Sequence, residues 1–346
     1  INGVGKISDM RQWNETLGDY VYFWGEGLDN DDDGWVNDDY IGGVDLNRNY
    51  EYGWEPCPWW FAPFYGEYPF SEPETQAVRD FVLAHPNIAT AFDTHSGAQC
   101  ILYPWSHKFD SPPDANIYDR LSEEYLDMTS YVAGQTPYVL YPCTGTSMDW
   151  FYGDQGIIYF TNEVFGLYYF DPEDPFSETK FIEVYPDAVL PWQAFEHPQL
   201  GTVEIGGYDY FRFYNPPESE IEAVCLRNLP MILHLAEITP DLKITGAKFK
   251  ILALTTTKHK YSDVNLSIDL TNAGFLPTAT QQALQNGIAQ PVTVSLQLSP
   301  NVMLIAGEPA TSIEVLHAGQ TTKISWTVRV KVPSMNWAMV TAQTPR

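Results

Sequence analysis

The chain has 346 residues, enough for one large or two ordinary domains, and its 11 Trp and 22 Tyr allow a substantial core. Its formal net charge of -27 argues against nucleic acid as a partner, because the phosphates would be repelled. No run of about 20 apolar residues is present, so we expect no membrane span. The first residue is Ile1 and no signal peptide is visible, so we expect a processed chain; the acidity suits a soluble protein that is extracellular or salt-tolerant.

The charge is unevenly distributed along the chain. Residues 1–240 contain 40 Asp and Glu against nine Lys and Arg, whereas residues 241–346 contain five against nine. A shift this sharp predicts a domain boundary near residue 240. The cysteines permit up to two disulfides, whose connectivity cannot be deduced from spacing; they are Cys57, Cys100, Cys143 and Cys225.

The predicted elements of the first domain, residues 1–240, alternate between helices and short apolar strands. Residues 1–60 are rich in Gly, Asp and Trp, and we expect mostly loop with short strands there. Ser71 is a candidate N-cap, with Glu74 completing a capping box. Such alternation predicts an α/β domain with a mostly parallel or mixed sheet and flanking helices. The expected helices cover 71–84, 115–132 and 218–236, and the expected strands 88–93, 100–103 and 156–163.

The second domain, residues 241–346, changes character. Short segments that alternate or run apolar, rich in β-branched residues, are separated by turn residues at short intervals. This pattern predicts a small all-β sandwich. The expected strands cover 247–254, 263–270, 292–298, 312–315 and 322–330.

An acidic loop in the first domain is a candidate Ca²⁺ site. Asp29, Asp31 and Asp33 place oxygens at positions one, three and five, Gly34 follows at six, and Asn37 stands at nine. Position twelve lacks the bidentate Glu of an EF-hand, and a merely solvated acidic loop is an equally good interpretation.

Three short segments carry side chains suited to catalysis: GVDLNRNY at 43–50, DTHSG at 93–97 and FTNEV at 160–164. In the first, the planar fork of Arg48 suits a bidentate grip on a carboxylate, and Asn47 adds a neutral donor. An isolated Arg is more often part of a surface ion pair.

The other two segments place a polar side chain at the end of a strand. His95 follows a buried strand, where α/β sheets position ligands. Glu163 ends an apolar strand, and a carboxylate beside a metal-bound water can accept its proton. Taken alone, a histidine is more often structural, and an ordinary strand-end Glu is equally common.

In this order the three segments resemble the zinc carboxypeptidase family, over roughly residues 40–240. The resemblance implies that His95 is a zinc ligand and that Asn47 and Arg48 bind the terminal carboxylate of the substrate. It also implies that Asp45 orients a zinc-bound histidine and that Glu163 is the general base.

Two further roles follow from the resemblance of the stretch 144–164 to the family. Tyr141 corresponds to the tyrosine that closes over bound substrate, with Tyr138 as its rival. Met148 falls where the family sets side-chain preference. An apolar residue there favours aromatic or aliphatic C-terminal residues, although the acidity elsewhere leaves a basic preference open.

The sequence also departs from the family. The His-x-x-Glu zinc motif expected ahead of the Asn-Arg run is absent, so we expect a chain that begins after it and an N-terminal companion segment that carries the other ligands. The Arg that stabilises the oxyanion falls on Asn14, and Arg11 is the nearest substitute. His234 and Glu237 have the His-x-x-Glu spacing within a helical pattern, but they follow the general base, and we favour a structural role.

The resemblance implies a secreted zinc carboxypeptidase that releases the C-terminal amino acid of a peptide or protein. One alternative is a non-catalytic peptide- or glycan-binding protein on the same scaffold, which the missing motif and Asn14 favour. Another is an amidase that acts on cell-wall peptide. The turn at 271–278 resembles that of accessory β-domains that follow some bacterial secreted carboxypeptidases.

Overall fold

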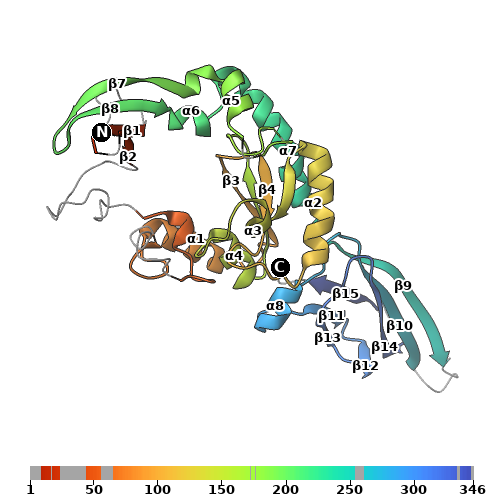
Figure 1. Ribbon diagram of the computed structural model, residues 1–346. Coiled ribbons are helices and arrows are strands. Elements are labelled where there is room, and N and C mark those ends of the chain that lie inside the picture. The colour runs from red at the N-terminus through yellow and green to blue at the C-terminus, as the bar shows by residue number, and fades with distance from the viewer. Residues whose placement is uncertain are drawn as a thin grey trace. The chain divides into compact units, whose positions relative to one another are not determined.

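The computed structural model forms two compact units (Figure 1). Unit 1 comprises residues 1–80, 92–151 and 159–233, and unit 2 comprises 81–91, 152–158 and 234–346. Each unit therefore gathers segments that are far apart in the sequence. The residues that the structure describes are 9–16, 18–23, 44–55, 65–171, 173–175, 177–253, 261–332 and 336–343.

A mixed sheet, mainly within unit 1, contains the strands that carry the candidate site (Figure 1). Its order is β3-β6-β4-β5; β4 and β5 pair in parallel, whereas β4 and β6 pair antiparallel. The strands are β3 (Thr90–His95), β4 (Cys100–Tyr103), β5 (Val132–Gln135) and β6 (Ile158–Glu163). Every residue of β4 is buried, as expected for a strand covered on both faces.

Helix α2 (Ala115–Thr129) packs on this sheet through aromatic side chains. Tyr118 and Tyr125 are buried on its apolar face, about one and three turns from its start, and both rings contact Phe160 of β6, at centroid distances of 5.4 and 5.1 Å. Tyr118 also stacks on Tyr103 of β4 at 5.0 Å. Such offset and edge-to-face contacts add to the apolar area that the helix buries. The strand that carries Glu163 is therefore held by a close-packed aromatic core.

The remaining helices mostly follow the predicted periodicity. Helix α1 begins at Pro73, so Ser71 lies two residues before it. The Ser71 hydroxyl donates to Glu72 and accepts from Asn49 at 2.9 Å, and the predicted capping role is wrong because these partners occupy it. The helices are α1 (Pro73–Ala84), α3 (Thr136–Val139), α4 (Ser147–Gly153), α5 (Thr179–Val184), α6 (Tyr210–Tyr214) and α7 (Ile221–Glu237).

A second sheet in unit 1 pairs segments from the two ends of that unit. Its order is β2-β1-β8-β7, and all its neighbours are antiparallel. Met10, Val203 and Ile205 form its small buried cluster. The strands are β1 (Asp9–Asn14), β2 (Asp19–Phe23), β7 (Val189–His197) and β8 (Gly201–Tyr208).

Unit 2 contains the predicted β-sandwich. One antiparallel sheet has the order β12-β14-β10-β9, the other β13-β11-β15, and Leu270, Val294 and Trp326 from both sheets share one buried cluster. Inward-facing apolar residues from two sheets are the defining core of a sandwich. The strands are β9 (Leu242–Ala253), β10 (Tyr261–Asn272), β11 (Val292–Leu298), β12 (Val302–Ala306), β13 (Ala310–Ile313), β14 (Thr321–Lys331) and β15 (Ala338–Gln343).

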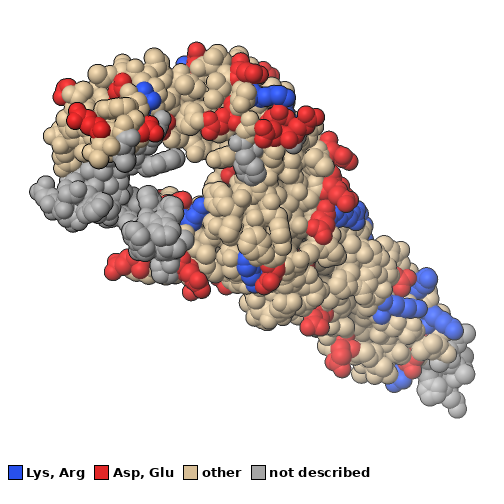
Figure 2. All heavy atoms as spheres, in the orientation of Figure 1, with Lys and Arg blue, Asp and Glu red and all other residues tan. Residues whose placement is uncertain are grey.

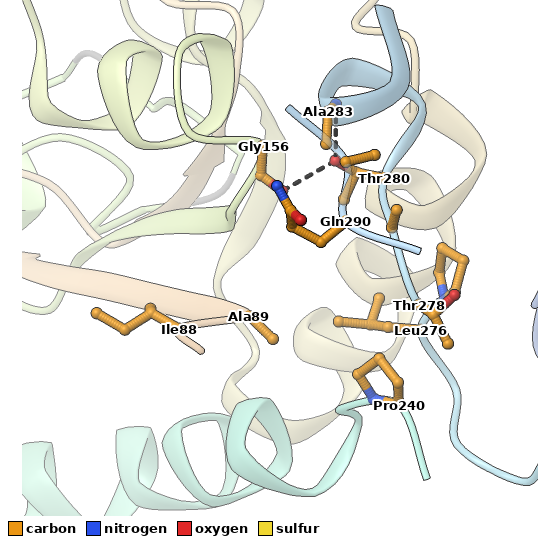
Figure 3. A pocket seen from close by; sticks show the side chains of 12 residues that line it. Ile88, Ala89, Gly156, Pro240, Leu276, Thr278, Thr280, Ala283 and Gln290 are labelled. Atoms are coloured by element: carbon orange, nitrogen blue, oxygen red, sulfur yellow. Dashed lines mark hydrogen bonds between the residues drawn. The ribbon is translucent and has the colours of Figure 1, made fainter. Parts of the chain in front are cut away.

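Within unit 2, helix α8 (Gln281–Asn286) contacts the turn that precedes β6 (Figure 3). The Thr280 hydroxyl accepts from Ala283 N at 3.1 Å, which caps α8, and donates to Gly156 O at 2.9 Å. Gln282 adds a bond to Gly153 O at 2.9 Å. Gly156 has φ +65°, and a Cβ there would lie 2.6 Å from Ala283 Cβ, so both conformation and space require glycine. A cavity of about 30 Å³, roughly one water, lies beside this contact.

The surface repeats the charge asymmetry of the sequence. On the face shown in Figure 2, acidic side chains predominate over unit 1, whereas acidic and basic side chains are interspersed on the β-sandwich. Among the described residues, no helix is long and apolar enough to cross a bilayer.

Candidate active site

A cavity of about 210 Å³ in unit 1 brings together side chains from the three motif segments. They come from the turn at 45–48, the end of β3 and the end of β6, and the start of α4 adds Met148, so the lining residues lie between positions 45 and 163 of the chain. The lining residues are Asp45, Asn47, Arg48, His95, Ser96, Leu102, Ser106, Thr136, Leu140, Tyr141, Cys143, Thr146, Met148, Thr161 and Glu163.

Asn47 and Arg48 enter the cavity from a short 3-10 turn, η1 (Leu46–Arg48). The turn is capped by Asp45, whose side chain accepts from Asn47 N at 2.9 Å. Arg48 donates from Nη1 to Asn47 O at 2.7 Å, and no described carboxylate lies within ion-pair distance of its guanidinium. Burial acts to lower the pKa of Arg48, but the neighbouring Cys143 and Asp45 raise it above its ordinary value. The guanidinium is thus charged and oriented, with donors that the described carboxylates do not use.

The side-chain amide of Asn47 is held from α4. Its Oδ1 accepts from Ser147 N at 2.8 Å and from Ser147 Oγ at 3.0 Å, so its Nδ2 is turned the other way, 3.5 Å from His95 Nε2. The segment before α4 approaches closely because Gly145, at φ +66°, has no Cβ; one would lie 2.3 Å from Arg48 O. The amide therefore has one orientation that satisfies its oxygen.

His95 is the last residue of β3, and its ring is paired with the residue two positions earlier. Its Nε2 lies 3.1 Å from Asp93 Oδ2, and Asp93 Oδ2 also accepts from Ser147 Oγ at 3.0 Å. The hydrogen bond to Asp93 is the main cause that raises the pKa of His95; burial opposes it. Residues two apart on a strand share a face, and this places the Asp93 carboxylate beside the ring of His95, which lines the cavity.

Glu163 is the last residue of β6 and faces the same cavity. Burial raises the pKa of its carboxyl to about 7, and His95 partly opposes this shift. Its Oε2 is buried and has no hydrogen-bond partner among the described residues, and the same holds for Asp93 Oδ1. A carboxyl with a pKa near neutrality can both accept and return a proton at physiological pH.

Tyr141 and Met148 line the part of the cavity beyond Arg48. Tyr141 is 55% exposed, and burial of its phenol raises its pKa, with Arg48 partly offsetting the change. Met148 is buried and its sulfur accepts from Thr136 Oγ1 at 3.5 Å. The rival Tyr138 does not line the cavity, and its hydroxyl donates to Phe109 O at 3.1 Å.

The structure does not bring Arg11 or Asn14 to this cavity. Arg11 lies on β1, where its Nε donates to Glu204 at 2.9 Å and its guanidinium stacks on the rings of Tyr20 and Trp192, each 3.9 Å away. An ion pair and two aromatic faces explain its place without catalysis. His234 and Glu237 lie on α7 and do not line the cavity either. The predicted Ca²⁺ ligands Asp29, Asp31, Asp33 and Asn37 lie outside the described residues.

Two residues that hydrogen-bond to the cavity side chains were missed by the sequence reasoning: Asp93, which contacts His95, and Ser147, which contacts Asn47. Asp93 could have been found from its position two residues before His95 on a strand, which places both on one face. Ser147 had no comparable signal, because its partner Asn47 is 100 residues away.

The donor set is incomplete for the zinc ion that the resemblance implies. A catalytic zinc takes three protein ligands. In the described part of the chain, no group of three or more His, Cys, Asp or Glu side chains is arranged to hold a metal ion, and His95 is the one histidine at the cavity. The residues described here therefore do not complete a zinc centre by themselves.

Comparisons with known proteins agree with the motif segments. Residues 11–179 match the family model described as zinc carboxypeptidase. Residues 248–346 match a model described as a domain of unknown function. Similar solved structures include thrombin-activatable fibrinolysis inhibitor, 34% identical over 35% of this chain and 33% of that one, with a TM-score of 0.31. The bovine protein in complex with tick carboxypeptidase inhibitor is 26% identical over 56% and 55%, with a TM-score of 0.37.

Curated relatives cover the same part of the chain. Mast cell carboxypeptidase A of Mus musculus is 38% identical over 128 residues, which is 33% of this chain and 30% of the relative. Carboxypeptidase A1 of Sus scrofa is 32% identical over 130 residues, 34% of this chain and 30% of the relative. Carboxypeptidase A4 of Mus musculus is 34% identical over 136 residues, covering 35% and 31%. The match thus spans about three-tenths of the length of each of these relatives.

Proposed function

Because residues 11–179 of this chain belong to the zinc carboxypeptidase family, we propose that the protein releases C-terminal amino acids from peptides. The substrate is the free C-terminus of a peptide or protein. In this proposal the described residues supply the part of the active site that recognises the terminal carboxylate, together with one carboxyl for proton transfer.

The observation that carries the proposal is the environment of Arg48. Its guanidinium lines the cavity and forms no ion pair with a described carboxylate. Its pKa is raised above the ordinary value, so it carries a positive charge. Asn47 adds an amide donor that Ser147 holds in one orientation. A planar fork beside a neutral donor fits a carboxylate in bidentate fashion.

The neighbouring residues fit the rest of the substrate. Glu163, with a pKa of about 7, is suited to accept a proton from water and return it to the leaving amine. Leu102, Leu140 and Met148 give the cavity an apolar side, which favours an aromatic or aliphatic C-terminal residue. Tyr141 is exposed enough to move over a bound ligand.

Zinc is the metal that the family implies, and it would supply Lewis-acid activation of water. His95 would provide one ligand. We propose that the others come from residues outside those described, on an N-terminal companion segment. We also propose that the protein acts outside the cell and that residues 241–346 form an accessory domain following a catalytic domain at 1–240.

The test is hydrolysis of N-acyl dipeptides by the zinc-replete full-length protein, across apolar, basic and acidic C-terminal residues. We expect cleavage of apolar substrates with a free carboxylate, no cleavage of the matching C-terminal amides, and loss of activity in chelator. Glu163→Gln is the matched control, since it keeps the shape of the side chain and removes the proton acceptor. A full-length protein that is inert on every class would sink the proposal.

A second candidate is a non-catalytic peptide-binding protein on the same scaffold. It is favoured by the incomplete metal donor set of the described residues. It predicts that the full-length protein binds N-acyl amino acids with a free carboxylate and holds no stoichiometric zinc. Metal analysis of the full-length protein separates the two candidates.

A further inference from the structure

One hydroxyl, that of Ser147, lies between the carboxylate-binding residues and the imidazole of the cavity. It is 3.0 Å from Asn47 Oδ1 and 3.0 Å from Asp93 Oδ2, and Asp93 Oδ2 is in turn 3.1 Å from His95 Nε2. We propose that Ser147 is a positioning residue that orients the Asn47 amide for the substrate carboxylate and, through Asp93, sets the ring of His95. The inference rests on the proposed function, because it assigns Asn47 to a carboxylate ligand.

The first part of the argument concerns the two ends of the Asn47 amide. An amide oxygen and an amide nitrogen have nearly the same shape, so the side chain can present either end to a ligand. The nitrogen attracts a carboxylate and the oxygen repels it. Ser147 contacts Oδ1 through both its backbone N and its hydroxyl, at 2.8 and 3.0 Å, and so directs Nδ2 toward the cavity.

The second part concerns the single proton of the Ser147 hydroxyl. Asn47 Oδ1 and Asp93 Oδ2 are each 3.0 Å from Ser147 Oγ, and the two acceptors share this proton in a three-centre hydrogen bond. The Tyr159 hydroxyl, 3.4 Å away, donates to Ser147 Oγ in return.

The third part links Asp93 to the tautomer of His95. Asp93 Oδ2 has no proton when ionised, so the ring must donate from Nε2 to satisfy the 3.1 Å contact. The Nε2 side of the ring is thereby held against Asp93. One hydroxyl thereby connects the orientation of an amide to the tautomer of an imidazole, in a partly buried site where such bonds are strengthened.

The test compares two ligands that differ only at the terminus: N-acetyl-phenylalanine and its C-terminal amide. Titration calorimetry on the chain should show that the wild type binds the acid more tightly. We expect Ser147→Ala to weaken binding of the acid about 5- to 10-fold and leave the amide unchanged, since one neutral hydrogen bond is lost. Ser147→Thr keeps the hydroxyl and should restore most of the discrimination.

The matched control is Ser122→Ala, which removes a buried hydroxyl from α2, away from the cavity, and should change neither affinity. In an Asn47→Ala background, Ser147→Ala should have no further effect on the acid. Ring nitrogen NMR of His95 supplies the second readout. We expect Ser147→Ala to broaden or shift the Nε2 resonance toward a mixture of tautomers, as Asp93→Asn should do more strongly.

The outcomes separate the inference from the function on which it rests. A wild type that does not distinguish acid from amide overturns the proposed function and this inference together. A wild type that does distinguish them, with the ratio unchanged in Ser147→Ala, overturns the inference alone. Equal losses for both ligands would mean a merely structural role for Ser147, and unchanged His95 resonances would break the link through Asp93.

Discussion

The site has a side of hydrogen-bond donors and a side of carboxylates, and the two sides differ in how fully the described residues supply their hydrogen-bond partners. On the donor side, Asn47 is held by two hydrogen bonds from Ser147, and Arg48 is oriented by its own turn. On the acidic side, Asp93 and Glu163 each have a buried oxygen without a partner among the described residues. Buried polar atoms are usually paired, and exceptions concentrate at functional sites. The comparison indicates a donor side that is preorganised and an acidic side that remains electrostatically unfavourable.

The largest expected effect tests the donor side. Arg48→Ala should weaken binding of N-acetyl-phenylalanine about 100-fold, because a charge-assisted bidentate contact is lost, while binding of the amide changes little. Arg48→Lys keeps the charge but not the planar fork, and an intermediate loss of about 10-fold is expected. Calorimetry with both ligands checks this. If Arg48→Ala binds the acid as the wild type does, the donor side is not the carboxylate site.

The next effect tests the acidic side through stability. The pKa of Glu163 is raised in the fold from 4.5 to about 7, so the penalty for ionising it is absent below the unfolded value and complete above the folded value. Glu163→Gln should therefore stabilise the metal-free protein by about 2–3 kcal/mol near pH 8 and have no effect near pH 4.

Chemical denaturation of the wild type and of Glu163→Gln, near pH 4 and near pH 8, measures this difference in the free energy of unfolding. Asp149→Asn is a contrasting substitution. Asp149 accepts hydrogen bonds from Ser106 and His107, so the variant protein should be less stable than the wild type at both pH values. Equal stability of Glu163→Gln and wild type near pH 8 would show that the acidic side carries no such penalty.

The smallest effect concerns the exposed rim. Tyr141 is 55% exposed, so Tyr141→Phe should leave the free energy of unfolding within about 0.5 kcal/mol and change affinity for the acid less than about 3-fold. Tyr141→Ala removes the ring as well and should weaken the acid and the amide alike. If Tyr141→Phe weakened binding of the acid as much as Arg48→Ala does, the Tyr141 hydroxyl would be one of the groups that bind the carboxylate.

Local patterns in the sequence predicted the buried elements well. The strands expected at 100–103 and 292–298 have those bounds in the structure, and the strand expected at 156–163 runs from Ile158 to Glu163. Residues 100–103 are a continuous apolar run and residues 292–298 alternate apolar and polar side chains, and both patterns favour a strand. The mixed α/β class followed from the same alternation of helices and strands.

The β7–β8 hairpin was not expected, and its pairing explains why. Pro191 lies inside β7, where proline argues against a strand, and the pairing with β8 is shifted between Leu190 and Gln193. A bulge moves the alternation by one residue, so the apolar pattern of the strand is not continuous. Periodicity alone does not reveal such a strand.

The site was predicted as far as single segments define it. The structure brings Asp45, Asn47, Arg48, His95, Tyr141, Met148 and Glu163 to one cavity, while their roles remain proposals. Arg11 was chosen from its proximity to Trp13 in the sequence, but two of its partners, Trp192 and Glu204, are on strands much later in the chain. Contacts of that kind depend on strand pairing, which residue spacing does not specify.

The contact of α8 with the turn before β6 has a consequence for synthesis of the protein. Thr280 and Gln282 bond to carbonyl oxygens that lie 124 and 129 residues earlier. At about 5–20 residues per second, a ribosome needs roughly 6–25 s to supply those partners. Throughout that interval, Gly153 and Gly156 have emerged without the side chains that later bind them. The nascent strand that ends at Glu163 therefore gains its upstream anchor only after residues 280–282 have been synthesised.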